Sequence, residues 1–398
     1  MTLNEKMVSH IIQNDGMSVD GDEAWFVDRT ENVLYKWNLK TEICNYITTI
    51  PIQRKNGFRN NSICLKCDDN IFLFPDAGTS IWIYNVATDS FLNIPIDNPS
   101  HIRIGAIGCW REKENIWVTA LGLKEIWRIS IVEKKITAIY KIFENIEIEC
   151  GSATELIDGK LYVGAVNTGI LCEFCTSTEA VRYKKIRGME DGINTICYDG
   201  ERIWFSGKNN KLAGWKREED DFIEIIIPPC FIDKHESSRS TKEIERTLFH
   251  QSLYDGERIW LFPWKLKNSR FVCKNVLYFD CKSREIKTLE LNKQKTEGIV
   301  TSAYMLRGKC MNLSYDGIDA PIFAELDLKT FALQEKHMYR TYQDVSKSLR
   351  EKILNRGNVQ EYNTMELEAY IKNCNVNQER VREKEDNVGC RIYECNAH

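Results

Sequence analysis

The side chains that most often perform catalysis or bind metals are present in this chain, but they lie far apart. The six histidines are His10, His101, His235, His250, His337 and His398. A protein zinc site takes its ligands from cysteines, histidines and carboxylates at short characteristic spacings, and no two of these histidines have such a spacing. The G-x-S-x-G, H-E-x-x-H, Walker A and G-x-G-x-x-G motifs are also missing from the sequence. An active site would therefore have to be assembled from residues distant in sequence.

Fifteen cysteines are scattered along the chain without a regular framework. Two pairs have the C-x-x-C spacing, Cys64 with Cys67 and Cys172 with Cys175. Both pairs fall in or near expected strands, where residues three apart point to opposite faces. We interpret the cysteines as buried thiols in a reducing compartment, with metal or redox chemistry as the alternative. We expect no metal and no cofactor.

The elements that must position any site repeat along the chain. The segment CYDGERIWFS from Cys197 is nearly copied as LYDGERIWLF from Leu253, with seven identical residues in a row. Weaker copies extend the pattern to seven units that recur roughly every 40 to 56 residues, which is a period typical of propeller blades. The units begin at Val19, Cys67, Trp110, Ile157, Tyr198, Tyr254 and Leu306. The last unit is degraded, so six or eight units also fit.

Each unit is expected to form a four-stranded antiparallel sheet. Asp-Gly pairs at 20–21, 158–159, 199–200 and 255–256 favour two-residue type I′ hairpins, which need positive φ at both central positions. The strands that follow are apolar on both faces, so each sheet must pack between two neighbours. One large aromatic side chain on each second strand should fill the space between adjacent sheets. These aromatics are Trp25, Phe72, Trp117, Tyr162, Trp204 and Trp260.

The period and the D-G-x-x-I-W motif resemble those of kelch-like and streptogramin-lyase-like β-propellers over about residues 10 to 340. The resemblance implies an all-β fold of seven four-stranded blades, with the segment MVSHIIQ as a candidate extra strand for ring closure. Streptogramin lyases use His and Glu residues with a divalent metal. Those positions do not match this sequence residue by residue, so their activity does not carry over.

Polar residues recur where the first strand of each unit is expected to start, at the mouth of a central channel. From these positions we predict Asp15, Asn61, Asn194 and Gln251 as ligand-binding residues. If the protein is an enzyme, His250 is the predicted general base, Arg103 an anion clamp, and Asp15 or Glu155 the carboxylate. The alternative is that these side chains only line a water-filled channel.

Two long loops indicate a second element of the same site. The connection 228–247 between the fifth and sixth units and the hairpin that starts at Pro263 are the longest of their kind, and long loops in compact domains are often binding loops. The strand order places both on one face and in one sector. The two loops bring Trp264 and Arg270 close to several lysines, and we predict that Trp264 and Arg270 bind ligand. This basic and aromatic surface could receive an acidic peptide or another anionic group.

The last part of the chain, 341–398, departs from the repeat. DVSKSLREKILNRG and NTMELEAYIKNC have apolar residues at helical spacing, so we expect a propeller over 1–340 and a short helical tail over 341–398. The tail packs on the propeller in one interpretation and presents a surface to a partner in the other.

The composition of the chain argues against some classes of function. A net charge of −4 and the absence of a basic stripe argue against nucleic-acid binding. The N-terminus has no signal-peptide pattern and no long apolar run occurs, so we expect a cytoplasmic protein without a membrane segment. Two functions fit: a scaffold that binds a protein or peptide through the loop-rich face over units five and six, or a lyase, hydrolase or transferase with a pocket over the channel. The first is preferred. The oligomeric state cannot be read from the sequence.

Overall fold

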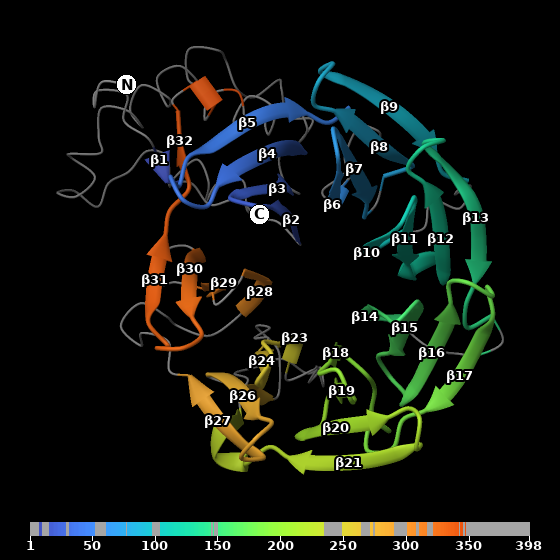
Figure 1. The fold of residues 1–398 in the computed structure, drawn as a ribbon, viewed down its shortest axis with the longest axis vertical. Coiled ribbons are helices and arrows are strands. Elements are labelled where there is room, and N and C mark those ends of the chain that lie inside the picture. The colour runs from blue at the N-terminus through green and yellow to red at the C-terminus, as the bar shows by residue number, and fades with distance from the viewer. Residues whose placement is uncertain are drawn as a thin grey trace, which may run out of the picture. The chain divides into compact units, whose positions relative to one another are not determined.

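The computed structural model contains seven four-stranded antiparallel sheets (Figure 1). The residues that the structure describes are 8–9, 16–28, 32–51, 61–76, 78–97, 104–144, 146, 150–234, 249–263, 271–273, 275–289, 301–307, 310–316, 321–341, 343–344 and 347. We number the sheets 1 to 7 in chain order. In each sheet the four strands lie in sequence order, and each pairs with the strand before it. The repeat of the sequence is therefore a repeat of sheets, and their number is seven.

Each of the seven sheets has a first, second, third and fourth strand in chain order. The first strands are β2 (Met17–Asp20), β6 (Asn61–Cys67), β10 (Ala106–Glu112), β14 (Cys150–Ile157), β18 (Thr195–Tyr198), β23 (Phe249–Tyr254) and β28 (Thr301–Arg307). The second strands are β3 (Glu23–Asp28), β7 (Asn70–Pro75), β11 (Asn115–Ala120), β15 (Lys160–Ala165), β19 (Ile203–Ser206), β24 (Arg258–Pro263) and β29 (Cys310–Asp316). The third strands are β4 (Val33–Asn38), β8 (Ser80–Asn85), β12 (Glu125–Ser130), β16 (Ile170–Cys175), β20 (Lys211–Lys216), β26 (Val276–Asp280) and β30 (Pro321–Asp327). The fourth strands are β5 (Cys44–Thr49), β9 (Ser90–Pro95), β13 (Lys135–Lys141), β17 (Val181–Lys185), β21 (Asp221–Ile226), β27 (Glu285–Leu289) and β31 (Leu333–Lys336).

The hairpins between first and second strands lie where the Asp-Gly pairs predicted them, but only one has the predicted form. Asp158 and Gly159 both have positive φ, 49° and 70°, as a type I′ turn requires. In sheets 5 and 6 only the glycine of each pair has positive φ, and at 20–21 only Gly21 does, so the type I′ prediction was wrong there. In sheets 5 and 6 the loop is longer, and the aspartate stabilises it by accepting backbone hydrogen bonds from the residues two and three positions later.

The hairpins between third and fourth strands are the most regular feature of the repeat. Each contains one non-glycine residue in the left-handed region, with φ between 49° and 62°. These residues are Glu42, Asp89, Lys134, Glu179, Asp220, Arg284 and Phe331. In four sheets an Asn or Asp side chain at the end of the third strand accepts hydrogen bonds from backbone N–H groups of the turn. All seven copies, including the degraded last one, therefore close their outer hairpin in the same way.

The chain divides into two compact units, which we describe separately: 1–103 with 337–398, and 104–336. The second unit contains sheets 3 to 7. Within it the first strands of successive sheets contact one another, β10 with β14, β14 with β18, β18 with β23 and β23 with β28. Figure 1 shows these five sheets in succession, with their first strands on the inner side and their fourth strands on the outer side.

Large aromatic side chains fill the space between neighbouring sheets, as the sequence predicted. Trp117 of sheet 3 packs against Phe174 of sheet 4 with ring centroids 5.3 Å apart. Trp204 of sheet 5 meets Phe279 of sheet 6 at 5.1 Å. Three other predicted aromatics also pack against the next sheet of their own unit, namely Trp25, Tyr162 and Trp260. One sheet cannot bury both of its apolar faces alone, and these contacts bury them against the next sheet.

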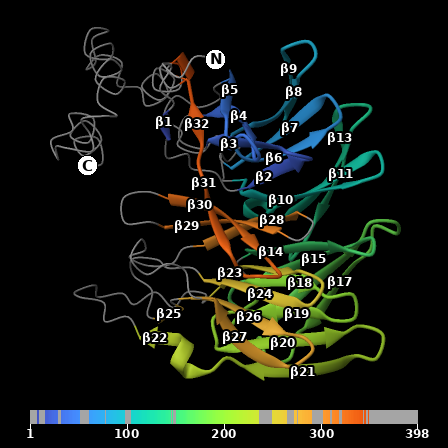
Figure 2. The same ribbon diagram turned by 60° about the vertical axis from the view of Figure 1, so that its left-hand side comes forward.

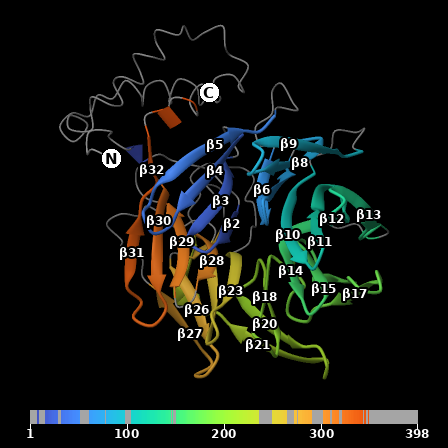
Figure 3. The ribbon, with the colours of Figure 1, turned by 45° about the horizontal axis from the view of Figure 1, so that its top comes forward.

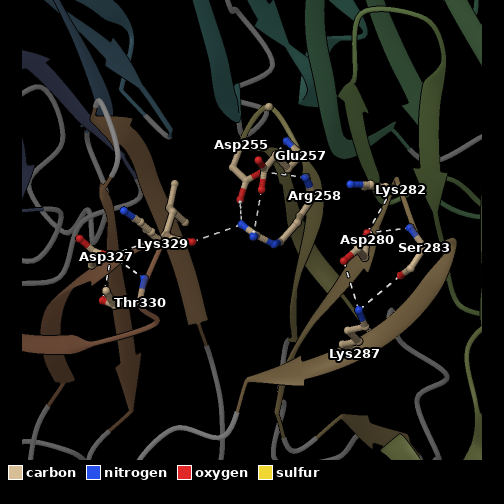
Figure 4. Close-up of polar contacts among 12 residues, drawn as sticks. Asp255, Glu257, Arg258, Asp280, Lys282, Ser283, Lys287, Asp327, Lys329 and Thr330 are labelled. Carbon is tan, nitrogen blue, oxygen red and sulfur yellow. Dashed lines mark hydrogen bonds and ion pairs between the residues drawn. The ribbon is translucent and has the colours of Figure 1, made fainter.

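Polar contacts also connect neighbouring sheets, and Arg258 at the start of β24 is an example. Its guanidinium donates to the carboxylate of Asp255 at 3.1 Å and, across to sheet 7, to the backbone carbonyl of Leu328 at 3.2 Å. It also stacks on the ring of Phe331 at 5.0 Å. Figure 4 shows Arg258 reaching from its own hairpin toward the last turn of sheet 7, where Asp327 caps the backbone.

The first unit contains sheets 1 and 2 and a short clasp. Val8–Ser9 (β1) pairs with Tyr339–Arg340 (β32), so the predicted extra strand from MVSHIIQ is present, although its partner is the segment after sheet 7 in sequence. β32 contacts β5 (Figure 3). The fully buried Arg340 donates to the hydroxyl of Tyr35 at 2.6 Å. This clasp pairs β1 with β32 and holds β32 against sheet 1.

The predicted helical tail lies outside the described residues, apart from residues 341, 343, 344 and 347. Among the described residues no helix is long and apolar enough to cross a membrane.

Candidate functional site

The two long loops that the sequence singled out come together in space. Ile232–Lys234 (β22) belongs to the connection between sheets 5 and 6, and Phe271–Cys273 (β25) belongs to the long hairpin of sheet 6. They pair antiparallel as a two-stranded sheet that is separate from sheets 1 to 7 (Figure 2). The register places Asp233 opposite Val272. We call this element, residues 232–234 and 271–273, the ribbon.

The strand pairing of the ribbon is separate from that of the seven sheets. In the part of the chain that the structure describes, neither of its strands pairs with a third strand. An edge strand of this kind can template the addition of another strand. The ribbon follows the short helix η2 (Pro229–Phe231), and Phe231 packs on the core between sheets 5 and 6. The ribbon is therefore connected to a rigid base, while its edges lie outside the seven sheets.

The structure describes only some of the predicted site residues. Trp264, Arg270, Arg103 and Asp15 lie outside the described residues, and of His250 only the backbone, in β23, is described. Their predicted roles stay predictions.

The three other predicted ligand-binding residues belong to the beginnings of first strands, as expected. Gln251 is partly exposed on β23. Asn194 precedes β18, and its backbone N–H donates to the carbonyl of Ser206 at 2.8 Å. Asn61 begins β6 in the other unit, and its amide donates to Asn32 at 3.0 Å. Both asparagines are almost fully buried, and their side-chain oxygens have no hydrogen-bond partner among the described residues.

Glu155, proposed from the sequence as a carboxylate, has the most altered environment of these candidates. It lies on β14 opposite Tyr162 of β15. Burial raises its pKa to about 7, against the opposing effects of hydrogen bonds from the backbone of Leu156 and the side chain of Trp110. A carboxyl group of this kind can hold or release a proton near neutral pH.

The sequence analysis missed the partner of Glu155. The sequence places Trp110 of β10 only at the start of a repeat unit. Its ring folds back over Gly108, since a Cβ added at Gly108 would lie 2.1 Å from the Trp110 ring and 2.5 Å from the Thr154 hydroxyl. A glycine two residues before a first-strand tryptophan is the signal that could have indicated this close packing.

The cysteine side chains that the structure describes differ in burial. Among the nine cysteines whose side chains the structure describes, none forms a disulfide. The described residues contain no group of three or more His, Cys, Asp or Glu side chains that could hold a metal ion. Cys64 and Cys67 are buried, and so is Cys172. Cys175 differs, because hydrogen bonds from Ser177 and Thr178 lower its pKa to about 7.

Comparison with known proteins supports the fold alone. No family model and no curated relative match the chain. Among solved structures, a chain of the mitotic checkpoint complex aligns with a TM-score of 0.54 and 9% identity, over 84% of this chain and 89% of that one. BamB from Moraxella catarrhalis aligns with 0.51 and 10%, over 78% and 84%. The chain has a β-propeller fold. A third match, the dihydro-heme d1 dehydrogenase NirN in complex with DHE, has a TM-score of 0.51 and 12% identity, over 84% and 67%. At these identities the propeller fold is shared and function is not implied.

Proposed function

We propose that this propeller is a binding or scaffold module that holds a protein or peptide partner on the side of sheets 5 and 6 where the ribbon lies. The observation that carries the proposal is the pairing of the two longest loops into one strand-edged element. Extended peptides often bind proteins by adding a strand to such an edge, because backbone hydrogen bonds then provide affinity.

Charge supports an acidic partner. The hairpin segment WKLKNSR, residues 264–270, contains three basic residues and no acidic one, in a chain whose net charge is −4. Complementary charge increases the rate of encounter and discriminates against basic partners. An anionic small molecule is the other ligand with matching chemistry.

The comparisons are compatible with this role, since one matching propeller comes from a structure named as the mitotic checkpoint complex, an assembly. We further propose a cytoplasmic location, a reducing environment for the thiols, and no role in nucleic-acid or membrane binding, on the basis of the composition described above.

A second function, catalysis in a pocket on the inner side of the first strands, is favoured by one observation, the raised pKa of Glu155. In that case the carboxyl group would act as an acid or base, and His250 and Arg103 would keep the roles predicted for them. Thermal-shift screening of metabolites would support it if a compound stabilised the wild type and left Glu155→Gln unchanged.

The experiment that tests the scaffold proposal is affinity capture from native lysate with three forms of the protein. The wild type is compared with a His250→Ala/Trp264→Ala variant, and with a control in which two exposed apolar residues of sheet 3, Val132 and Ile139, are changed to alanine. A partner retained by the wild type and the control, and lost by the first variant, supports the proposal. Equal capture by all three forms contradicts it.

A further inference from the structure

Glu155 occupies a position at which the other sheets have no carboxyl group. In every sheet one residue of the first strand lies opposite the central residue of the second strand. These first-strand residues are Ser18, Leu65, Trp110, Glu155, Cys197, Leu253 and Met305. Six of the seven are uncharged at neutral pH. The acidic residue in sheet 4 is therefore a departure from the repeat, and packing between sheets does not explain it.

The surroundings of Glu155 come from three successive first strands. The Trp110 ring of β10 and the Thr154 hydroxyl of β14 both lie close to Gly108. The Trp110 side chain donates a hydrogen bond to the Glu155 carboxyl group. Cys197 of β18 is the third group, since its pKa is raised chiefly by burial and further by the charge of Glu155. The carboxyl group therefore interacts with an indole on β10 and with a buried thiol on β18.

No cation among the described residues neutralises Glu155. In the described part of the chain it forms no ion pair with a lysine, arginine or histidine, and no basic side chain is among the groups that alter its pKa. Both Glu155 and Trp110 keep some solvent-accessible surface. A poorly hydrated carboxylate without a cation costs free energy, and a cation supplied from outside would offset that cost.

We propose that Glu155 and Trp110 form a recognition site for an organic cation, an ammonium or guanidinium group. A carboxylate beside an indole is suited to this chemistry, because the charge attracts the cation and the aromatic surface favours groups with a weakly held hydration shell. The group can be a lysine or arginine side chain of a partner or a free amine. The site lies on sheets 3 to 5 and does not depend on the ribbon.

The test is a titration of the full chain, labelled with 13C at the Glu side-chain carboxyls, with methylguanidinium, methylammonium and tetramethylammonium. Two further arms use the capped tripeptides Gly-Arg-Gly and Gly-Lys-Gly. The Glu155 resonance is assigned by its loss in Glu155→Gln, and Trp110 fluorescence gives a second readout. The control is Glu133→Gln, a carboxyl on an exposed outer turn.

At pH 8 we expect a saturable shift of the Glu155 resonance that persists in the control. Glu155→Gln should bind at least tenfold more weakly. Binding at pH 5 should be about 10- to 100-fold weaker, because a carboxyl with its pKa about 7 is then almost fully protonated. If the tripeptides bind tenfold more tightly than the free cations, the site takes a partner side chain, whereas tighter binding of the free cations indicates a small amine. Absence of any saturable shift up to millimolar cation, or an equal fluorescence response in Glu155→Gln, would overturn the proposal.

Discussion

The indole nitrogen of Trp260 donates a hydrogen bond, 2.8 Å long, to the carboxylate of Asp255, five residues earlier. The same contact joins Trp204 to Asp199 at 2.6 Å. The D-G-x-x-I-W motif therefore has a physical reason, because its aspartate both caps the hairpin and fixes the tryptophan that fills the space between two sheets. A partly buried indole N–H without an acceptor would cost about 1–3 kcal/mol.

Loss of this aspartate should weaken the fold. Asp255→Ala leaves the Trp260 indole N–H and two backbone N–H groups without their acceptor, so we expect the free energy of unfolding to fall by about 2–3 kcal/mol. Urea denaturation followed by tryptophan fluorescence measures it. The control is Glu257→Ala, two positions after Asp255. Because the Glu257 side chain is 76% exposed, its loss should change the free energy of unfolding by less than about 0.5 kcal/mol. Equal effects of the two changes would refute this role for Asp255.

The aromatic side chains between sheets should contribute more. Trp117→Ala removes a side chain that is 2% exposed and packs against sheet 4, so a loss of about 3–5 kcal/mol is expected. Leu92→Ala, at an exposed position of an outer strand, is the control and should be nearly neutral. The same denaturation experiment decides the matter, and a loss below about 1 kcal/mol for Trp117→Ala would be inconsistent with the packing described.

The sequence predicted the seven sheets and the packing of their aromatics because both depend on local patterns repeated many times. It also indicated that the two long loops share one sector, which their pairing in the ribbon agrees with. It failed at 199–200 and 255–256, where the turn form depends on loop length and on the aspartate side chain. It also missed Trp110 beside Glu155, because that contact joins residues 45 positions apart on different strands and no local pattern records it.

Stability should depend on pH through Glu155. Its folded-state pKa, about 7, lies above the ordinary value of 4.5, so the protonated form favours folding. The associated stability is present below pH 4.5 and is lost as pH rises through 7. Wild type should therefore lose stability relative to Glu155→Gln across this window, by less than about 3 kcal/mol because the side chain is partly exposed. Parallel stability curves for the two proteins between pH 4.5 and 8 would exclude the raised pKa.

Cys175 should be the most reactive of the described thiols near neutral pH. Hydrogen bonds from Ser177 and Thr178 stabilise its thiolate, and the thiolate is the nucleophile. We expect its alkylation by iodoacetamide to reach half of its maximal rate near pH 7, and Ser177→Ala to shift that midpoint upward. Peptide mapping by mass spectrometry measures this with the exposed Cys230 as an internal comparison. A midpoint unchanged in Ser177→Ala would contradict the assigned cause.

The ribbon register can be tested with a native cysteine. Ile232 lies directly opposite Cys273, so Ile232→Cys should place two thiols across the strand pair and form a disulfide under mild oxidation. Lys234→Cys, which lies opposite Phe271, should not cross-link to Cys273. Peptide mapping distinguishes the two variants, and similar cross-linking in both would mean that this pairing is wrong.

The central claim, that the ribbon holds a partner, is tested most directly by site-specific photo-cross-linking in native lysate. A benzophenone amino acid is placed at Val272 in the ribbon and, as a matched control, at Ile139, which is 51% exposed on the outer strand of sheet 3. The account predicts one reproducible cross-linked protein from position 272, reduced by high salt, and none from position 139. The same cross-linked protein from both positions, or from position 139 alone, would contradict it.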